Sequence, residues 1–145
     1  ELENCDVPPS NGNGGGSVVG NAQAPFAEKL IVNVDSQQSM PLSYDNAFGP
    51  SETTLTLDGQ DWTASEVKTL SLFVYGQDNN SGQLYVKINN SKVVYDGDIT
   101  AAQWQQWDID LTTLDGLQNV TSLTIGVDGA SAAGMLYIDD IRLYP

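Results

Sequence analysis

Acidic side chains are the residues of this sequence most able to do chemistry, since 19 Asp and Glu stand against 5 Lys and Arg and there is no histidine. The lack of histidine excludes an imidazole base, Ser-His-Asp and Cys-His nucleophiles, and imidazole metal ligands. The net charge of -14 excludes the basic face that nucleic acid or an anionic membrane surface would require. An excess of carboxylates instead favours a hard cation bound through oxygen, with calcium as the first candidate.

Two adjacent acids, Asp139 and Asp140, interrupt an apolar run that reads MLYIDDIRLY from 135 to 144. Successive side chains of a strand point to opposite faces, so one of these carboxylates should face the core. A buried carboxylate without a partner is costly, and a divalent ion is the expected partner in a chain with so few cations. Neutralisation by Arg142 or by a turn of backbone amides is the alternative.

Aromatic rings set among planar amides form a second group of candidates, because such rings stack on the C–H face of a sugar while amides and carboxylates bind its hydroxyls. On one concave sheet, Tyr75, Tyr85 and Trp104 would line a groove for a glycan chain. The alternative is a solvated sheet face with ordinary cross-strand pairs. The predicted ligand-binding residues are Trp104, Tyr85, Tyr75, Gln77, Lys87 and Trp62, the last of which lies in the loop DGQDWTAS and also suits a fold-stabilising role.

Nine short runs of alternating apolar residues, separated by Gly, Asn, Asp, Ser and Pro, must position these side chains. They cover residues 29–34, 39–45, 53–58, 68–76, 83–89, 92–96, 106–111, 122–128 and 135–144. This pattern predicts an all-β fold, a two-sheet antiparallel β-sandwich, with Trp107 in its core. Helix should be limited to single turns at 63–67 and 112–117, the first with the Thr63 and Glu66 spacing of a capping box.

The first 25 residues differ in composition from the rest of the chain. Residues 1–25 are rich in Gly, Pro, Asn and Ser, which is typical of a linker or docking segment, whereas 26–145 should form the folded domain. A short strand at 17–19, or docking onto a neighbouring copy, would hold part of this segment. No run approaches the ~18 apolar residues of a membrane span. Because the sequence begins with Glu1 and not Met, we expect it to be part of a longer precursor.

Four stretches of the sequence together resemble the jelly-roll carbohydrate-binding modules of bacteria. They are DSQQSMPLSYDN at 35–46, DWTASEVKTLSLFVYG at 61–76, WQQWDIDL at 104–111 and LYIDDIRLYP at 136–145. The resemblance implies a sandwich with jelly-roll topology, attached to a secreted or cell-surface protein. It also implies a structural calcium between the first and last strands, and a sugar-binding face or loop cluster that carries aromatic residues.

The same resemblance implies which residues bind the calcium. The last-strand acid of such modules matches Asp139, and Asp140 is second because a bulge could exchange their directions. The acid from the N-terminal region would be Asp35, although related modules often carry a glutamate there. Backbone carbonyls would complete a shell of roughly six to eight oxygens. The implied metal ligands are thus Asp139, Asp35, Asp140 and Asp45, with Ser39 or Glu28 as substitutes.

We expect the function to be non-catalytic binding of a neutral or weakly charged polysaccharide outside the cell. A glycosidase needs two convergent carboxylates. Asp108 and Asp110 share a strand face about 6.5–7 Å apart, but the Glu-x-Asp-x-x-Glu arrangement of jelly-roll glycosidases is missing. The alternative is a structural or assembly domain of an extracellular fibre, surface layer or adhesin, in which residues 1–25 dock onto the next subunit.

Overall fold

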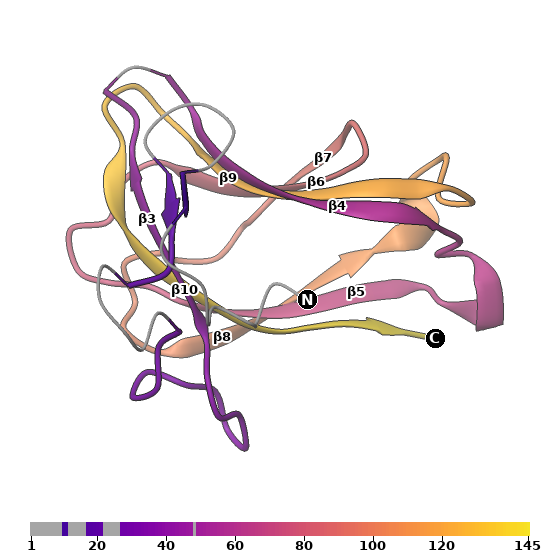
Figure 1. Cartoon of the computed structure of the whole chain (residues 1–145), viewed down its shortest axis with the longest axis horizontal. Coiled ribbons are helices and arrows are strands. Elements are labelled where there is room, and N and C mark those ends of the chain that lie inside the picture. The colour runs from indigo at the N-terminus through magenta and orange to yellow at the C-terminus, as the bar shows by residue number, and fades with distance from the viewer. Residues whose placement is uncertain (1–9, 12–16, 22–26, 48) are drawn as a thin grey trace.

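The computed structural model describes residues 10–11, 17–21, 27–47 and 49–145, and in that part of the chain two antiparallel sheets pack face to face (Figure 1). The strands are β1 (Ser10–Asn11), β2 (Val18–Val19), β3 (Met40–Asp45), β4 (Ser51–Gln60), β5 (Thr69–Tyr75), β6 (Gln83–Ile88), β7 (Ser91–Val94), β8 (Trp104–Asp110), β9 (Val120–Asp128) and β10 (Ala133–Tyr144). One sheet has the order β1-β2-β3-β10-β5-β8 and the other β4-β9-β6-β7. The predicted two-sheet jelly-roll sandwich is confirmed.

The core lies between the inner faces of the two sheets. Alternate residues of each strand point inward, so Leu72 of β5 and Val86 of β6 are each 1% exposed, and Trp107 of β8 is 6% exposed. Burial of one aliphatic side chain of this kind contributes roughly 1.5–3 kcal/mol. The alternation read from the sequence therefore identified the inner face correctly, including the core position of Trp107.

The strand predicted at 29–34 is wrong. Leu30 and Val34 are 91% and 83% exposed, and the chain there forms a loop. We call residues 27–39 the strap. It projects from the lower side of the six-stranded sheet in Figure 1, next to β3.

Local hydrogen bonds explain why the strap is not a strand. Glu28 and Ser39 close its two ends through a pair of backbone hydrogen bonds, each 3.0 Å long. The Glu28 carboxylate accepts from the backbone N–H of Leu30 at 2.7 Å, and the Ser39 hydroxyl donates to the Ile31 carbonyl at 2.6 Å. Asp35 adopts a left-handed conformation, with a φ of 64°. These contacts satisfy backbone groups that would otherwise need a neighbouring strand.

A β-bulge interrupts β10 at the two adjacent acids. Pairing of β10 with β5 shifts between Asp139 and Arg142, and Asp140 has a φ of 51°. Pairing of β10 with β3 ends at Ile138. The bulge keeps Ile141 packed against the core although Ile138 is also buried there. It therefore changes the simple alternation on which the sequence interpretation of the two acids relied.

The N-terminal segment contributes to the six-stranded sheet of its own chain. Val18 and Val19 pair with Ser43 and Leu42 of β3, which confirms the short strand predicted at 17–19. Most of the remainder of residues 1–25 lies outside the described residues. The assembly hypothesis relied on this segment docking onto another subunit, whereas its described strands pair in cis.

Helical structure among the described residues is limited to two short 3-10 turns, η1 (Ala64–Glu66) and η2 (Leu111–Thr113), as predicted. The capping box is wrong, because Thr63 makes no side-chain cap and its hydroxyl instead donates to Asp61 at 2.5 Å. No helix in the described part of the chain is long and apolar enough to cross a membrane.

Candidate functional site

Three aromatic residues form a row across the outer face of the six-stranded sheet. Tyr137 of β10 pairs with Tyr75 of β5, and Tyr75 pairs with Trp104 of β8. The ring centroids of Tyr75 and Trp104 are 5.3 Å apart, and those of Tyr75 and Tyr137 are 5.9 Å apart. These residues alternate with core positions, so their rings point away from the core. The register of three neighbouring strands thus sets the spacing of the row.

Polar side chains lie beside this aromatic row, further along β5 and β8. Gln106 pairs with Phe73, and Asp108 pairs with Ser71. The Gln106 amide donates to Asp108 Oδ1 at 3.0 Å and to the Ser71 hydroxyl at 3.3 Å. Gln106 and Asp108 are exposed. The face therefore combines apolar ring surface with a planar amide about one strand repeat (~6.6 Å) from Trp104 and a carboxylate about two repeats (~13 Å) away.

The strap covers one half of this face and leaves the other half open. Tyr137 is 8% exposed and Asp139 is fully buried, although both side chains point to the outer side of the sheet. Burial, and then the nearby negative charge of Glu28, raise the pKa of Tyr137. Tyr75 and Trp104 remain half-buried. The accessible part of the row is thus the Tyr75 and Trp104 pair on β5 and β8.

The prediction that Tyr85 and Lys87 share this face is wrong. Both belong to β6 of the four-stranded sheet, on the opposite side of the sandwich from Tyr75 and Trp104. Tyr85 does point away from the core, but it is only 1% exposed. Its ring lies across Gly126 of β9, where an added Cβ would come within 2.4 Å of the ring. The alternation of residues predicted that Tyr85 points outward, but it could not predict which sheet its strand belongs to.

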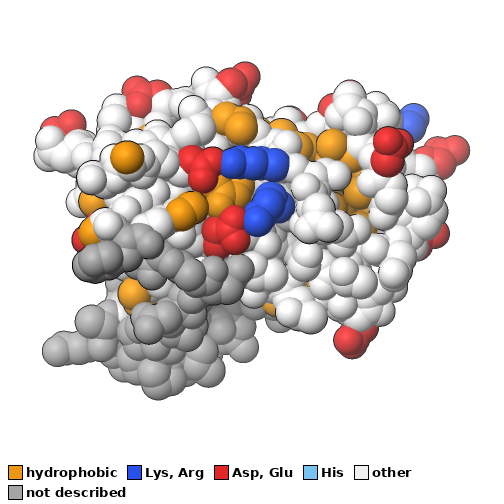
Figure 2. Space-filling model, turned by 90° about the horizontal axis from the view of Figure 1, so that it is seen from above, with side chains coloured by type: hydrophobic (Ala, Val, Ile, Leu, Met, Phe, Trp, Pro, Cys, Tyr) orange, Lys and Arg blue, Asp and Glu red, His pale blue; other side chains and the backbone are white. Residues whose placement is uncertain are grey.

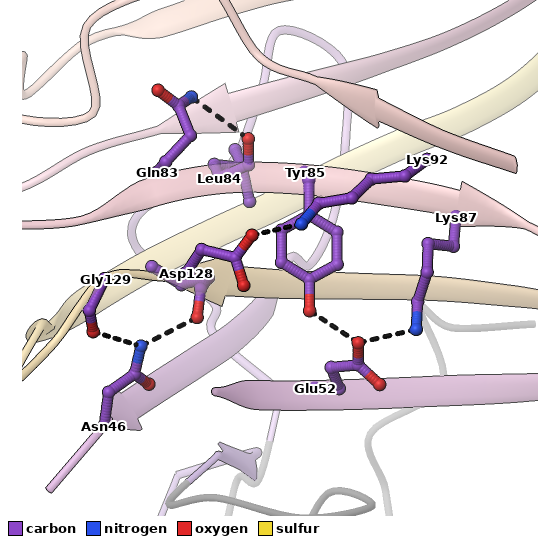
Figure 3. Close-up of polar contacts among 10 residues, drawn as sticks. Asn46, Glu52, Gln83, Leu84, Tyr85, Lys87, Lys92, Asp128 and Gly129 are labelled. Carbon is purple, nitrogen blue, oxygen red and sulfur yellow. Dashed lines mark hydrogen bonds and ion pairs between the residues drawn. The ribbon is translucent and has the colours of Figure 1, made fainter. Parts of the chain in front are cut away.

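A network of charged residues surrounds Tyr85 on that outer face (Figure 3). The Tyr85 hydroxyl donates to Glu52 Oε1 at 2.5 Å, and Lys87 Nζ lies 2.6 Å from the same oxygen. Lys92 lies 4.1 Å from the centre of the Tyr85 ring and pairs with Asp128. Figure 2 shows these basic and acidic groups side by side on this face. Lys87 is therefore engaged in an ion pair and does not join the aromatic row.

The network shifts the ionisation of its members. Burial and the hydrogen bond to Glu52 raise the pKa of the Tyr85 phenol strongly. Burial opposes ionisation of Glu52, but hydrogen bonds from Lys87 and Tyr85 together hold the pKa of its carboxyl below the ordinary value. Tyr85 thus stays protonated and Glu52 stays ionised at neutral pH, which suits a stabilising contact.

Of the two other predicted ligand-binding residues, Gln77 lies at the border of the Tyr75 and Trp104 pair and Trp62 lies far from it. Gln77 is exposed in the turn that follows β5, two residues beyond Tyr75. Trp62 is 5% exposed at the far end of β5, and its indole N–H donates to Gln60 at 3.0 Å.

The predicted metal ligands come together only in part. Asp139 Oδ2 accepts from the backbone N–H of Asn33 at 3.1 Å, and Oδ1 accepts from that of Asp140 at 2.8 Å. Asp140 accepts from the Asn33 amide at 2.8 Å and from Arg142 at 3.0 Å. Asp139 is therefore buried beneath the strap and not in the core, and its carboxylate accepts two backbone N–H groups.

Asp35 and Asp45 lie apart from this pair of acids. Asp35 is exposed in the strap, two residues beyond Asn33. Asp45 pairs with Ala133 at the other end of β10, six residues or about 20 Å of strand from Asp139. In the described ranges there is no group of three or more His, Cys, Asp or Glu that could hold a metal ion. A calcium ion at this corner stays a prediction, and Asp139, Asp140 and carbonyls of the strap are the groups that would hold it.

Sequence reasoning missed Tyr137, Phe73 and Gln106 as residues of the aromatic face. Their signal was present in the alternation, because Tyr137 lies between buried Leu136 and Ile138 and must point outward. What was missing was the order of strands, which places β10 and β8 on either side of β5.

No family model and no curated protein matches the chain. A family 11 carbohydrate-binding module from Clostridium thermocellum, solved with a β-1,3-1,4-mixed-linked tetrasaccharide, is 17% identical with a TM-score of 0.58, over 94% of each chain. The family 30 module of a cellulosomal cellulase from the same organism is 14% identical with a TM-score of 0.61, over 94% of this chain and 90% of that one.

An exo-β-agarase shows the same fold within a larger protein. It is 15% identical with a TM-score of 0.67, and the match covers all of this chain but 25% of the agarase. The described chain therefore has the jelly-roll fold of carbohydrate-binding modules. The same fold also occurs as one part of a larger protein, the agarase.

Proposed function

We propose that this chain is a non-catalytic carbohydrate-binding module that captures a polysaccharide on the open half of its six-stranded sheet. The observation that carries the proposal is the half-exposed pair of Trp104 and Tyr75, whose rings lie 5.3 Å apart beside the exposed Gln106 and Asp108. Exposed aromatic rings beside fixed amide and carboxylate groups are typical of a binding surface and are not needed for folding.

The arrangement can recognise both sides of a sugar ring. The apolar C–H face would stack on Trp104 and Tyr75, and burial of ring surface supplies the affinity. Gln106, one strand repeat from Trp104, and Asp108, two repeats away, offer a planar donor and acceptor to the hydroxyls of the same or the next sugar. Both are already oriented by their mutual hydrogen bond of 3.0 Å, which reduces the entropy lost on binding.

The strap sets the width of the site. Because it buries Tyr137 and Asp139, the open surface spans two strands, β5 and β8, which lie about 4.8 Å apart. A short segment of glycan fits this surface. The exposed acids Asp108 and Asp110 at its border disfavour sulfated or uronic polymers, so the ligand is a neutral glycan.

Asp110, the second acid of this face, stabilises the turn after β8 and is not suited to act as a general acid. Asp110 accepts from the backbone N–H and the hydroxyl of Thr112, and these hydrogen bonds lower its pKa. Asp108 is hydrogen-bonded to Gln106. A general acid would need a raised pKa. The module would instead concentrate an attached enzyme or cell-surface protein on its polysaccharide, outside the cell.

Affinity electrophoresis tests this function directly. Native gels would contain mixed-linked β-1,3-1,4-glucan, hydroxyethyl cellulose or agarose, because two of the structural neighbours are a module solved with a mixed-linked oligosaccharide and an agarase. At least one neutral polymer should retard the wild-type protein, and Trp104→Ala should abolish the retardation. The proposal is wrong if no polymer retards the wild type, or if Trp104→Ala migrates like the wild type in every gel.

A further inference from the structure

A separate cavity lies at the end of the sandwich where β4 leads into β5 and β8 leads into β9. Its volume is about 240 Å³, and its lining includes Trp62, Leu114, Leu117, Thr112, Asp115 and Gln118. In Figure 1 this is the right-hand end, where η1 joins β4 to β5. Tyr75 ends β5 and Trp104 begins β8 at the other end of the same strands. The cavity and the aromatic pair are thus separated by about 20 Å of strand.

The floor of the cavity is apolar and held in place. Trp62 and Leu117 are 5% and 4% exposed, and the Trp62 backbone N–H donates to the Leu117 carbonyl at 2.8 Å. The indole N–H of Trp62 is bound to Gln60 at 3.0 Å. The ring cannot turn without loss of this hydrogen bond. The edge of one fixed, nearly buried aromatic ring therefore forms part of the cavity floor.

The rim of the cavity carries two polar side chains that make no hydrogen bond or ion pair with the described residues. Asp115 and Gln118 are exposed, and neither makes a hydrogen bond or ion pair with another described residue. Thr112 differs, because its hydroxyl donates to Asp110 at 2.6 Å. Gly116, which lies between Asp115 and Gln118, has a φ of 74°, a conformation that glycine adopts without strain. A carboxylate and an amide thus face solvent above an apolar floor.

We infer that this cavity is a second carbohydrate site, which takes one neutral hexopyranose ring at the end of a glycan. A cavity of about 240 Å³ is smaller than those of drug-sized ligands and suits a single ring. The partly exposed Leu114 and the accessible edge of Trp62 contact the apolar side of the sugar, and Asp115 and Gln118 bind neighbouring hydroxyls. The exposed acids Asp61 and Asp115 near the rim exclude anionic sugars.

The site uses no residue of the Tyr75 and Trp104 face, so the two can be tested separately in one experiment. The 15N-labelled protein has three tryptophan indole signals, which Trp→Phe variants assign. It would be titrated with methyl β-D-glucopyranoside, methyl β-D-galactopyranoside and methyl α-D-mannopyranoside, and separately with mixed-linked glucan oligosaccharides. At least one monosaccharide glycoside should shift the Trp62 indole signal saturably and leave that of Trp104 in place.

Variants at the rim decide whether the shift reports this cavity. Asp115→Ala and Gln118→Ala should each weaken the apparent affinity by about fivefold, the effect of losing one hydrogen bond. Asp96→Ala removes an exposed acid from a turn outside the cavity and should leave the affinity within about twofold. Both rim residues are exposed, so the variants should keep the wild-type melting curve.

The inference is overturned if no glycoside moves the Trp62 signal, or if both rim variants bind like the wild type. A Trp104 signal that responds to oligosaccharide while Trp62 is silent would remove the cavity site and leave the proposed function standing. A Trp62 response that depends on Asp115, with no response of Trp104, would support the cavity and contradict the sheet-face site.

Discussion

The indole of Trp104 packs against the phenol ring of Tyr75 at a centroid distance of 5.3 Å and an interplanar angle of 58°. The two residues are direct partners in the register of β8 and β5. Because backbone pairing fixes their positions, little side-chain entropy would be lost when a ligand binds to them. This relationship makes the pair a rigid apolar surface on a largely polar face.

Replacement of Tyr75 by alanine should weaken polysaccharide binding by roughly tenfold, because it removes one ring of the surface and the support of the other. Tyr75→Phe keeps the ring and should bind within about twofold of the wild type, since stacking does not need the hydroxyl. Isothermal titration calorimetry with the retained polymer measures both. Equal affinity of Tyr75→Ala and the wild type would show that the glycan does not use this ring.

Replacement of Asp139 by asparagine should destabilise the protein by about 3 kcal/mol. A buried carboxylate accepts from the backbone N–H groups of Asn33 and Asp140, and hydrogen bonds to a charged group are each worth about 1.5–3 kcal/mol. In the asparagine variant, the side-chain NH2 group would face one of these two backbone N–H groups, which would then lack an acceptor. Urea unfolding measures the loss, and Asp45→Asn, at the exposed end of β3, is the control that should change stability little.

Removal of calcium should lower the melting temperature by several degrees, if the ion predicted from the sequence joins Asp139 and Asp140 to the strap. Differential scanning calorimetry with EDTA, and again after excess calcium, measures the effect. An unchanged transition would assign the neutralisation of Asp139 to the amides of Asn33 and Asp140 alone.

Glu52 should contribute stability above about pH 4.5 and lose it in acid. Its pKa in the folded protein lies below the ordinary value of 4.5, although burial opposes this, because Lys87 and Tyr85 bind the ionised form. A group with a lowered folded pKa stabilises the protein above its unfolded pKa, and the stability is lost as the pH falls through the folded pKa. The difference in unfolding free energy between wild type and Glu52→Gln should therefore shrink from pH 7 to pH 3. A difference that stays constant with pH would contradict the network.

The sequence predicted most of the strands because their signal is local. In QLYVKIN and QWDIDL, apolar residues alternate with polar ones, and the structure places Val86 and Trp107 in the core as this alternation requires. The run KLIVNV at 29–34 shows a similar pattern but forms the strap. The side chains of Glu28 and Ser39 hydrogen-bond to its backbone and hold it as a loop.

Which residues meet at the aromatic face depends on strand order and long-range contacts, and the alternation of apolar residues contains neither. Tyr85 was correctly predicted to point away from the core, but strand order places it in the other sheet from Tyr75. One of Asp139 and Asp140 was predicted to face the core, but Asp139 is buried on the outer face, beneath the strap. Both differences come from contacts between segments far apart in the sequence, such as the hydrogen bond between Asn33 and Asp139.

The most direct test of the proposed function is the affinity of wild type, Trp104→Ala and Tyr144→Ala for the neutral polysaccharide that retards the wild type, measured by isothermal titration calorimetry. Tyr144 is a matched control, because it is an exposed aromatic residue of the same sheet at the far end of β10. Trp104→Ala should raise Kd by roughly thirtyfold, about 2 kcal/mol of lost ring burial, and Tyr144→Ala should leave Kd within about twofold. Equal Kd values for wild type and Trp104→Ala, with both variants folded, would contradict the assignment of the binding site.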